Sequence, residues 1–172
     1  MKAAISVLNA SFLFLTTAMY LGTGWSMWLF QFPIAPRLTP DTYYWVFVPQ
    51  VASATTFFTW MTSLMIASSL LMAWLEWKTN MRWVPIVVLL AVLAATGLTV
   101  KFIFPYNNAM SAGIHDPAQL QEILGKWMAL NKVRVSLWTV QWASMMWYFG
   151  RRAYQALRLT VPGLISVEGR DR

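Results

Sequence analysis

Four long apolar stretches, separated by short polar or proline-containing segments, make up most of this chain. The first extends from the N-terminus to about residue 32, and the others cover about 50–77, 83–104 and 133–150. Each comes close to the roughly 20 apolar residues that a helix needs to cross a bilayer. The pattern therefore predicts an all-α membrane protein that folds as a four-transmembrane-helix bundle.

Prolines and polar residues indicate where these helices begin and end. Three prolines within 33–40 are expected to terminate the first helix, because proline lacks a backbone donor and disfavours helical geometry in the residue before it. Pro49 suits the first turn of the second helix, and Asp116 followed by Pro117 is a typical start for the last one. The first apolar stretch is much longer than that of a signal peptide, so we expect it to remain as a membrane helix.

The polar residues concentrate between the third and fourth apolar stretches. Pro105 is expected to close the third helix, with Asn107 and Asn108 in a turn behind it. Residues 105–132 are therefore expected to form a long, partly helical extramembrane segment. We expect one four-helix transmembrane domain over 1–160 and a C-terminal tail over 161–172.

Small residues in the first apolar stretch predict a close contact between helices. Gly22 and Ser26 are four residues apart and therefore share one helical face. Such pairs let a neighbouring membrane helix approach closely.

Composition and charge support the membrane interpretation. The chain is 58% hydrophobic and 11% charged, whereas a soluble domain has about 25% charged residues. Its net charge of +7 arises from basic residues at the ends of the apolar stretches, the pattern that orients helices in a bilayer, so we expect a lipid bilayer and no nucleic acid as partner. We expect an integral protein of a bacterial inner membrane, and the bias in basic residues predicts both termini in the cytoplasm.

Several kinds of chemistry are excluded by what the sequence lacks. Without cysteine there is no disulfide, thiolate metal site or thiol nucleophile, and a single histidine, His115, cannot form a multi-histidine metal centre or ligate haem twice. We therefore expect no metal and no cofactor. No Asp, Glu, His or Lys falls near the middle of a predicted span, which argues against a proton-coupled transporter.

The start of the last apolar stretch carries the strongest candidates for a binding site. Its polar and aromatic side chains recur at helical spacing on one face, so we expect Asn131 and Arg134 to turn inward and meet the ends of the other helices. The alternative for Arg134 is to extend to the lipid headgroups. The predicted ligand-binding residues are Asn107, Asn108, Trp127, Asn131, Arg134 and Trp138. They form an outer-facing pocket, and none of them is assigned a catalytic role.

Two other polar residues in the apolar stretches are expected to be structural. Gln141 lies deeper in the last stretch, where an interhelical hydrogen bond is the simplest use of an amide. Glu76 lies at the cytoplasmic end, where it would pair with Lys78, Arg82 or Arg151, or stay solvated.

The layout resembles the anthrone-oxygenase-like family of small four-helix membrane proteins, whose function is largely unknown. The resemblance is carried by Pro105 and Asn107, a polar helical linker, and then Trp127 and Arg134 entering the last membrane helix. An early helix with two glycines, Gly22 and Gly24, that runs into the proline-containing loop at 33–36 is also similar to the family.

One position departs from the family pattern. The family often has a histidine in the last helix between the tryptophan and the arginine, and this chain has Asn131 there. An amide donates and accepts hydrogen bonds but is not a general base at neutral pH. The resemblance therefore implies that oxygenase chemistry is either lost here or uses His115.

Two hypotheses about function remain open from the sequence. In the first, the pocket binds an aromatic or quinone-like small molecule, with amides and Arg134 for orientation and tryptophans for stacking, and the protein is related to cofactor-independent oxygenases. In the second, the chain is a non-catalytic accessory subunit that packs against a larger membrane complex. Whether it is an enzyme stays undecided at this level.

Overall fold

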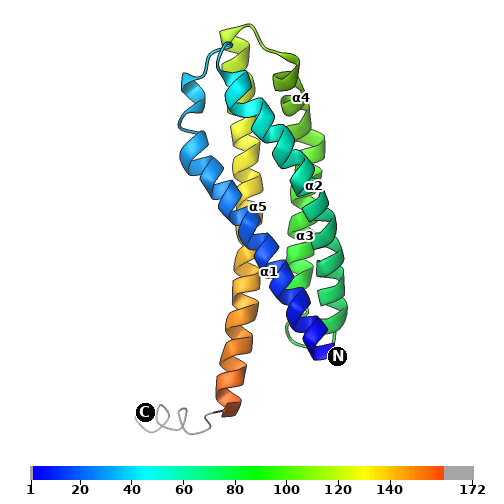
Figure 1. Cartoon of the computed structure of the whole chain (residues 1–172). Coiled ribbons are helices and arrows are strands. Elements are labelled where there is room, and N and C mark those ends of the chain that lie inside the picture. The colour runs from blue at the N-terminus through cyan, green and yellow to red at the C-terminus, as the bar shows by residue number, and fades with distance from the viewer. Residues whose placement is uncertain (1, 161–172) are drawn as a thin grey trace, which may run out of the picture.

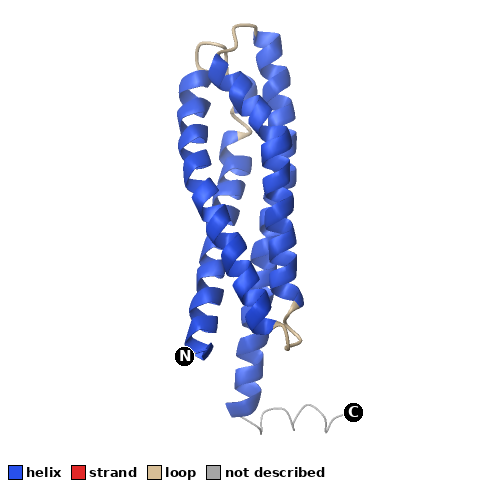
Figure 2. Cartoon of the chain, turned by 90° about the vertical axis from the view of Figure 1, so that its right-hand side faces the viewer, coloured by secondary structure: helices blue, strands red, loops and turns tan. Residues whose placement is uncertain are grey.

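The computed structural model of the chain describes residues 2–160, and every regular element in this range is helical (Figure 1). The long helices lie side by side in both views of the molecule (Figures 1 and 2). Two short turns of π-helix, η1 and η3, extend α1 and α3, and a 3-10 turn, η2, lies in the first connection. The elements are α1 (Lys2–Ser26), η1 (Met27–Gln31), η2 (Ala35–Arg37), α2 (Tyr43–Glu76), α3 (Trp83–Leu98), η3 (Thr99–Ile103), α4 (Phe104–Ala112) and α5 (Pro117–Thr160).

Three helical stretches within the described residues are long and apolar enough to cross a membrane: Lys2–Gln31, Tyr43–Glu76 and Trp83–Ala112. The predicted span at 133–150 is not among them, although it belongs to α5, the longest helix. Its polar residues Arg134 and Gln141 lower its apolar content, and both line the space between the helices. The four-helix arrangement is compatible with the predicted bundle, and α5 differs from the other three rods in its lower apolar content.

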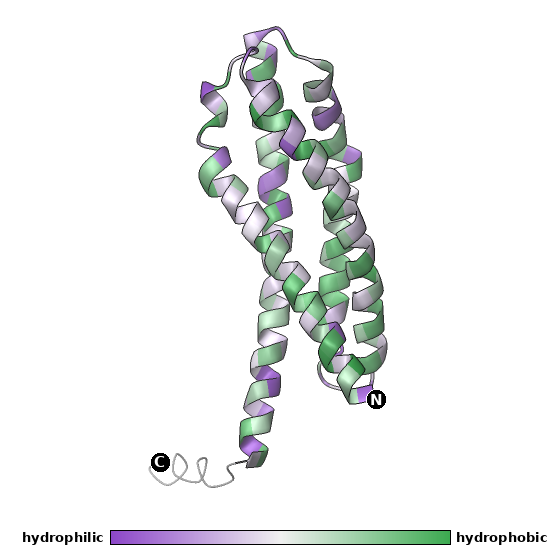
Figure 3. Ribbon diagram, in the orientation of Figure 1, coloured by the Kyte–Doolittle hydropathy of each residue, from purple (hydrophilic) through white to green (hydrophobic). Residues whose placement is uncertain are grey.

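The outer surface of the rods is strongly apolar. Large side chains such as Leu8, Trp45, Trp60 and Trp74 are about 70% or more exposed. Figure 3 shows hydrophobic residues along most of α1, α2 and α3, while the lower end of α5 is more hydrophilic. A hydrophobic surface of this extent is unusual for a soluble monomer and suits contact with lipid.

Gly24 makes the closest contact between α1 and α5. A Cβ atom on Gly24 would lie 2.7 Å from Cε3 of Trp138 and 2.9 Å from Cγ2 of Val135, too close for any side chain. The prediction that Gly22 and Ser26 form this contact is wrong, because a Cβ atom on Gly22 meets nothing within 4 Å. Positions two residues apart on a helix point in directions that differ by about 200°, so Gly24 faces α5 while Gly22 faces away from it.

Each π-helical turn stands directly before a proline. The amide of Phe32 donates to the carbonyl of Met27 over 3.0 Å, and Pro33 follows. The amide of Phe104 donates in the same way to the carbonyl of Thr99, and Pro105 follows. Proline has no backbone N–H to donate. A π-helical turn tolerates this missing donor better than an α-helical turn, because its carbonyls accept from amides five residues on instead of four.

Pro105 therefore opens a helix in this structure instead of closing one. It occupies the first turn of α4, where no donor is needed, and both Asn107 and Asn108 lie in α4. The prediction of a turn at these asparagines is wrong. The predicted segment 105–132 is helical except at 113–116, and the carboxylate of Asp116 caps α5 by accepting from the amides of Ala118 and Gln119 at 3.1 and 3.2 Å, as expected.

The second helix also begins earlier than predicted, at Tyr43 instead of near Pro49. The buried Tyr43 hydroxyl donates to the carbonyl of Met110 over 3.0 Å and accepts from the amide of Ile114 over 2.7 Å. This anchors the first turn of α2 to the α4–α5 connection, and the helix then continues through Pro49. The predicted C-terminal tail at 161–172 lies outside the described residues.

A buried polar cluster joins α2 to α5 at the opposite end of the bundle. The Glu76 carboxylate accepts hydrogen bonds from Tyr148 at 2.7 Å and from Thr79 at 2.7 Å, and it pairs with Arg152. The predicted ion pair is present, but with a partner other than the three expected. Arg152 is four residues from Tyr148 and shares its inward face, which neighbouring Arg151 does not.

Candidate functional site

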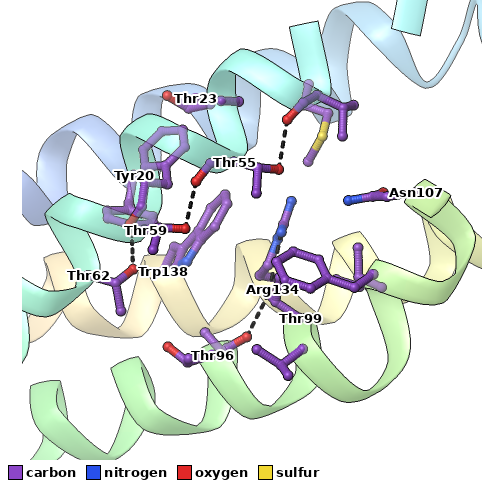
Figure 4. A pocket seen from close by; sticks show the side chains of 18 of the residues that line it. Tyr20, Thr23, Thr55, Thr59, Thr62, Thr96, Thr99, Asn107, Arg134 and Trp138 are labelled. Carbon is purple, nitrogen blue, oxygen red and sulfur yellow. Dashed lines mark hydrogen bonds between the residues drawn. The ribbon is translucent and has the colours of Figure 1, made fainter. Parts of the chain in front are cut away.

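A cavity of about 780 Å³ lies between α1, α2, α3 and α5, in the half of the bundle that holds the α4–α5 connection (Figure 4). Helix α5 supplies its back wall through side chains spaced three to seven residues apart. These lining residues of α5 are Trp127, Arg134, Trp138 and Gln141. Their spacing places them on one helical face, so a single helix presents a stripe of aromatic and polar groups to the cavity.

Arg134 is the single charged side chain among the described residues that line the cavity. Its guanidinium carbon lies 4.7 Å from the ring centroid of Trp138, a cation–π distance, and its Nη1 donates to the Thr99 hydroxyl across the bundle over 3.4 Å. Its Nε is buried without a hydrogen-bond partner in residues 2–160. Arg134 thus reaches across the interior toward α3, as predicted, and the headgroup-directed alternative does not hold.

Asn107 presents a fixed amide to the same cavity. Its Oδ1 accepts from the indole nitrogen of Trp127 over 2.8 Å. An indole N–H only donates, so this bond fixes the orientation of the amide and leaves the Asn107 NH₂ group free. In Figure 4 that nitrogen points into the cavity, on the side where the Arg134 guanidinium also lies.

Hydroxyl groups from α2 and α3 line the remaining walls. Thr55 and Thr59 donate to the carbonyls four residues before them, at 2.7 Å each, and Thr96 and Thr99 do so at 2.8 Å each. Since these protons are bound to the helix backbone, the cavity meets the methyl groups and the acceptor lone pairs. Free donors therefore come from Arg134 and from amide side chains, together with the exposed hydroxyls of Thr23 and Ser26 on α1.

The cavity opens sideways between the upper halves of α1 and α2. The lower edge of this opening is the contact of the Tyr20 hydroxyl with Thr62 and with the carbonyl of Phe58, and its upper edge is the bond from Gln31 to Gln50 at 3.5 Å. Between these edges the exposed lining residues are Gly22, Thr23, Ser26 and Thr59. Both π-helical turns contribute to the lining, so each proline-associated irregularity faces this space.

Four of the six predicted site residues line this cavity, namely Asn107, Trp127, Arg134 and Trp138. Asn131 turns inward as expected but is fully enclosed, with its amide nitrogen bonded to the carbonyl of Trp127 at 2.8 Å. Asn108 is exposed and lies outside the cavity lining, because one residue of helix rotates it about 100° from Asn107.

Some lining residues were not predicted. The threonines of α2 and α3 that line the cavity recur at helical spacing, so the sequence could have indicated them. Nothing in the sequence around Tyr20 indicates that it lines the cavity. The interhelical bond predicted for Gln141 is absent, and its buried Oε1 has no partner in residues 2–160. Gln141 instead lines the deep end of the cavity, two turns below Arg134.

Comparison with protein families, with curated proteins and with solved structures finds no match to this chain.

Proposed function

We propose that this chain is an integral membrane protein that binds an aromatic or quinone-like small molecule in the cavity between its four helices. The observation that carries the proposal is the cavity itself. Its volume of about 780 Å³ falls in the range of about 300–1,000 Å³ that small-molecule sites occupy. Its walls combine aliphatic and aromatic side chains with a few oriented polar groups, the usual composition of such sites.

The order of groups along α5 favours a flat ligand with polar atoms at separate positions. Arg134 and Gln141 are about 10 Å apart along the helix axis at 1.5 Å per residue, with the Trp138 ring between them. Each offers a buried polar atom without a protein partner: the Nε of the arginine and the Oε1 of the glutamine. Because both atoms are enclosed by protein, a ring stacked near Trp138 would reach them only after the two side chains turn toward the cavity, the arginine then acting as donor and the amide as acceptor.

Binding is better supported than catalysis. Among the described residues that line the cavity there is no Asp, Glu, His, Lys or Cys, and the Tyr20 hydroxyl is engaged by Phe58 and Thr62. His115, the base suggested by the resemblance to the anthrone-oxygenase-like family, is an exposed residue that does not line the cavity. Oxygenation in this cavity would therefore need a base that comes with the ligand.

The bilayer is the medium from which such a ligand would arrive. We place α1, α2, the α3–α4 rod and the lower part of α5 across the membrane, with the Glu76 cluster and both chain ends on the cytoplasmic side. The cavity then lies in the outer half, and its mouth between α1 and α2 faces the acyl chains. Apolar aromatic molecules concentrate in that region.

The test is ligand binding to the purified full chain in lipid nanodiscs. Alkylated naphthoquinones, neutral and ionised, are expected to quench tryptophan fluorescence saturably, because Trp127 and Trp138 line the cavity. Ala54→Phe would fill the cavity and remove this saturable quenching. Ala52→Phe on the same helix is the matched control, since Ala52 is exposed and lies outside the lining.

Two outcomes would overturn the proposal. One is quenching that is linear in quinone concentration, as expected for collision in the lipid. The other is saturable quenching that Ala54→Phe and Ala52→Phe leave equally unchanged while both variants keep the unfolding midpoint of the parent chain. Crosslinking that recovers a stable protein partner over this face would then favour the accessory-subunit alternative.

A further inference from the structure

We infer that the ligand carries an ionised oxygen, an enolate, phenolate or carboxylate, that the Arg134 guanidinium and the Asn107 amide hold together. This inference rests on the proposed binding function and specifies the chemistry of its ligand. It starts from an imbalance of charge: one cation lines the cavity, and no carboxylate among the described residues lines it with that cation.

The cation has few partners inside the protein. A guanidinium has five N–H donors, and Arg134 uses one of them, in a 3.4 Å bond to Thr99. No ion pair among residues 2–160 includes it, since the two that occur join Lys126 to Glu122 and Arg152 to Glu76. A charged group enclosed by protein without a counter-ion is destabilising, and a bound anion would relieve that cost.

Asn107 adds a second donor aimed at the same space. Its oxygen is held by Trp127, so the NH₂ group is what the ligand meets. The neighbouring hydroxyls on α2 and α3 give their protons to the backbone and contribute no competing donors. Arginine and a fixed amide together form a site with donors and positive charge on one side, which is complementary to an oxyanion and not to a cation or an amine.

The remaining wall explains why the anion should be part of a lipophilic molecule. Beyond Arg134 the cavity is lined by apolar side chains that include Phe47, Phe58, Met65 and Ile66. A small hydrophilic anion would leave these apolar surfaces unfilled and would itself be poorly soluble in the surrounding acyl chains, whereas an aromatic body would cover the surfaces. The site therefore fits an amphiphile with its charged oxygen at Arg134 and its rings against Trp138.

The experiment compares a 2-hydroxy-3-alkyl-1,4-naphthoquinone, which ionises to a coloured anion, with its 2-methoxy ether, which cannot ionise. In nanodiscs of zwitterionic lipid, the hydroxyquinone is expected to bind about tenfold or more tightly than the ether near neutral pH. Its absorbance should also show a pKa lowered by about one or more on binding, as a cation within about 4–6 Å produces.

Three variants of the full chain test whether Arg134 and Asn107 cause the preference for the hydroxyquinone and the shift in its absorbance. Arg134→Gln should abolish both the preference and the change in absorbance while the ether still binds. Asn107→Asp keeps an acceptor for Trp127 and brings a carboxylate to the site, so it should also weaken the hydroxyquinone. Asn108→Asp adds the same charge one residue away, outside the cavity. It should change neither the preference for the hydroxyquinone nor the shift in its absorbance.

The outcomes separate the inference from the proposed function. Equal binding of the two quinones, or a preference that survives Arg134→Gln, overturns the ionised-oxygen inference and leaves the binding site standing. No saturable binding of either quinone overturns both. Repeating the titration with phosphatidylglycerol in the nanodisc identifies the source of the anion: competition that depends on Arg134 would mean that the same oxyanion site holds a lipid phosphate, and lack of competition assigns it to the aromatic ligand.

Discussion

At the scale of single residues, Gly24 makes a close contact that any larger residue would disturb. It lies where α1 crosses α5, and its missing Cβ leaves room for Trp138 and Val135. This contact also holds the Trp138 ring in place under Arg134. The residue therefore connects the packing of the bundle to the shape of the cavity.

Gly24→Ala is expected to destabilise the protein by about 1–3 kcal/mol, the usual cost of inserting a carbon atom into a packed interface. The backbone of α1 or the Trp138 ring would have to move by several tenths of an ångström. Thermal unfolding in detergent, followed by circular dichroism, measures the effect. Gly22→Ala is the control, because its new Cβ meets nothing within 4 Å; a midpoint lowered equally in both variants would contradict this role.

Residue types and spacing predicted Arg134 but not Gly24. A polar residue in an apolar stretch is visible in the sequence, and its neighbours at i+4 and i+7 show which face is polar. Which of two glycines meets a neighbouring helix depends on the rotation and tilt of that helix, which are set by side chains far away in the chain. The pair Gly22 and Ser26 had the familiar spacing and turned out to line open space.

At the scale of elements, the all-helical fold and three of the four predicted spans followed from the apolar pattern, and the helix ends did not. Pro105 and Pro49 were interpreted as boundaries because proline ends most helices. In the structure a π-helical turn precedes Pro105, and the chain stays helical through it. Helix α2 begins before Pro49, at Tyr43, whose buried hydroxyl anchors its first turn. These are tertiary effects, since the Tyr43 partners lie about 70 residues away in the chain.

The gap between α1 and α2 is the feature of these elements with the clearest functional consequence. Its rim is framed by the bonds at Tyr20 and at Gln31, and Gly22 lies between them without a side chain. If ligands pass here, Gly22→Leu should slow quinone association about tenfold, equivalent to a barrier higher by about 1.4 kcal/mol, while the unfolding midpoint stays close to that of the parent.

Stopped-flow quenching of tryptophan fluorescence measures that rate. Gly97→Leu is the matched control, because Gly97 is an exposed glycine on α3 that also has open space around its Cβ position and does not line the cavity. Unchanged association in Gly22→Leu, with the same final extent of binding, would show that ligands reach the cavity elsewhere.

At the scale of the whole molecule, the two ends of the bundle are built differently. At one end Glu76, Arg152 and Tyr148 form a closed polar cluster that joins α2 to α5. At the other end the helices separate around the cavity, and α2 is joined to the α4–α5 connection through Tyr43. A lower half joined by polar contacts, with the cavity in the upper half, suits the proposed entry of a ligand from one leaflet.

This asymmetry makes the orientation in the bilayer a functional matter. Basic residues other than Arg134, which faces the cavity, are more numerous at the Glu76 end, where Lys2, Lys78, Arg82, Arg151, Arg152 and Arg158 lie. By the positive-inside rule, such a bias predicts that this end lies in the cytoplasm. The cavity and His115 would then lie toward the outer surface.

The absence of cysteine from the sequence allows a direct test of this orientation. Asn80→Cys places a thiol in the exposed turn between α2 and α3, and His115→Cys places one in the exposed connection between α4 and α5. In intact spheroplasts an impermeant maleimide is expected to label position 115 at once and position 80 only after the membrane is broken. The reverse pattern would mean that the cavity opens to the cytoplasmic leaflet, and labelling of both positions from outside would contradict a bundle whose two ends lie on opposite sides of the bilayer.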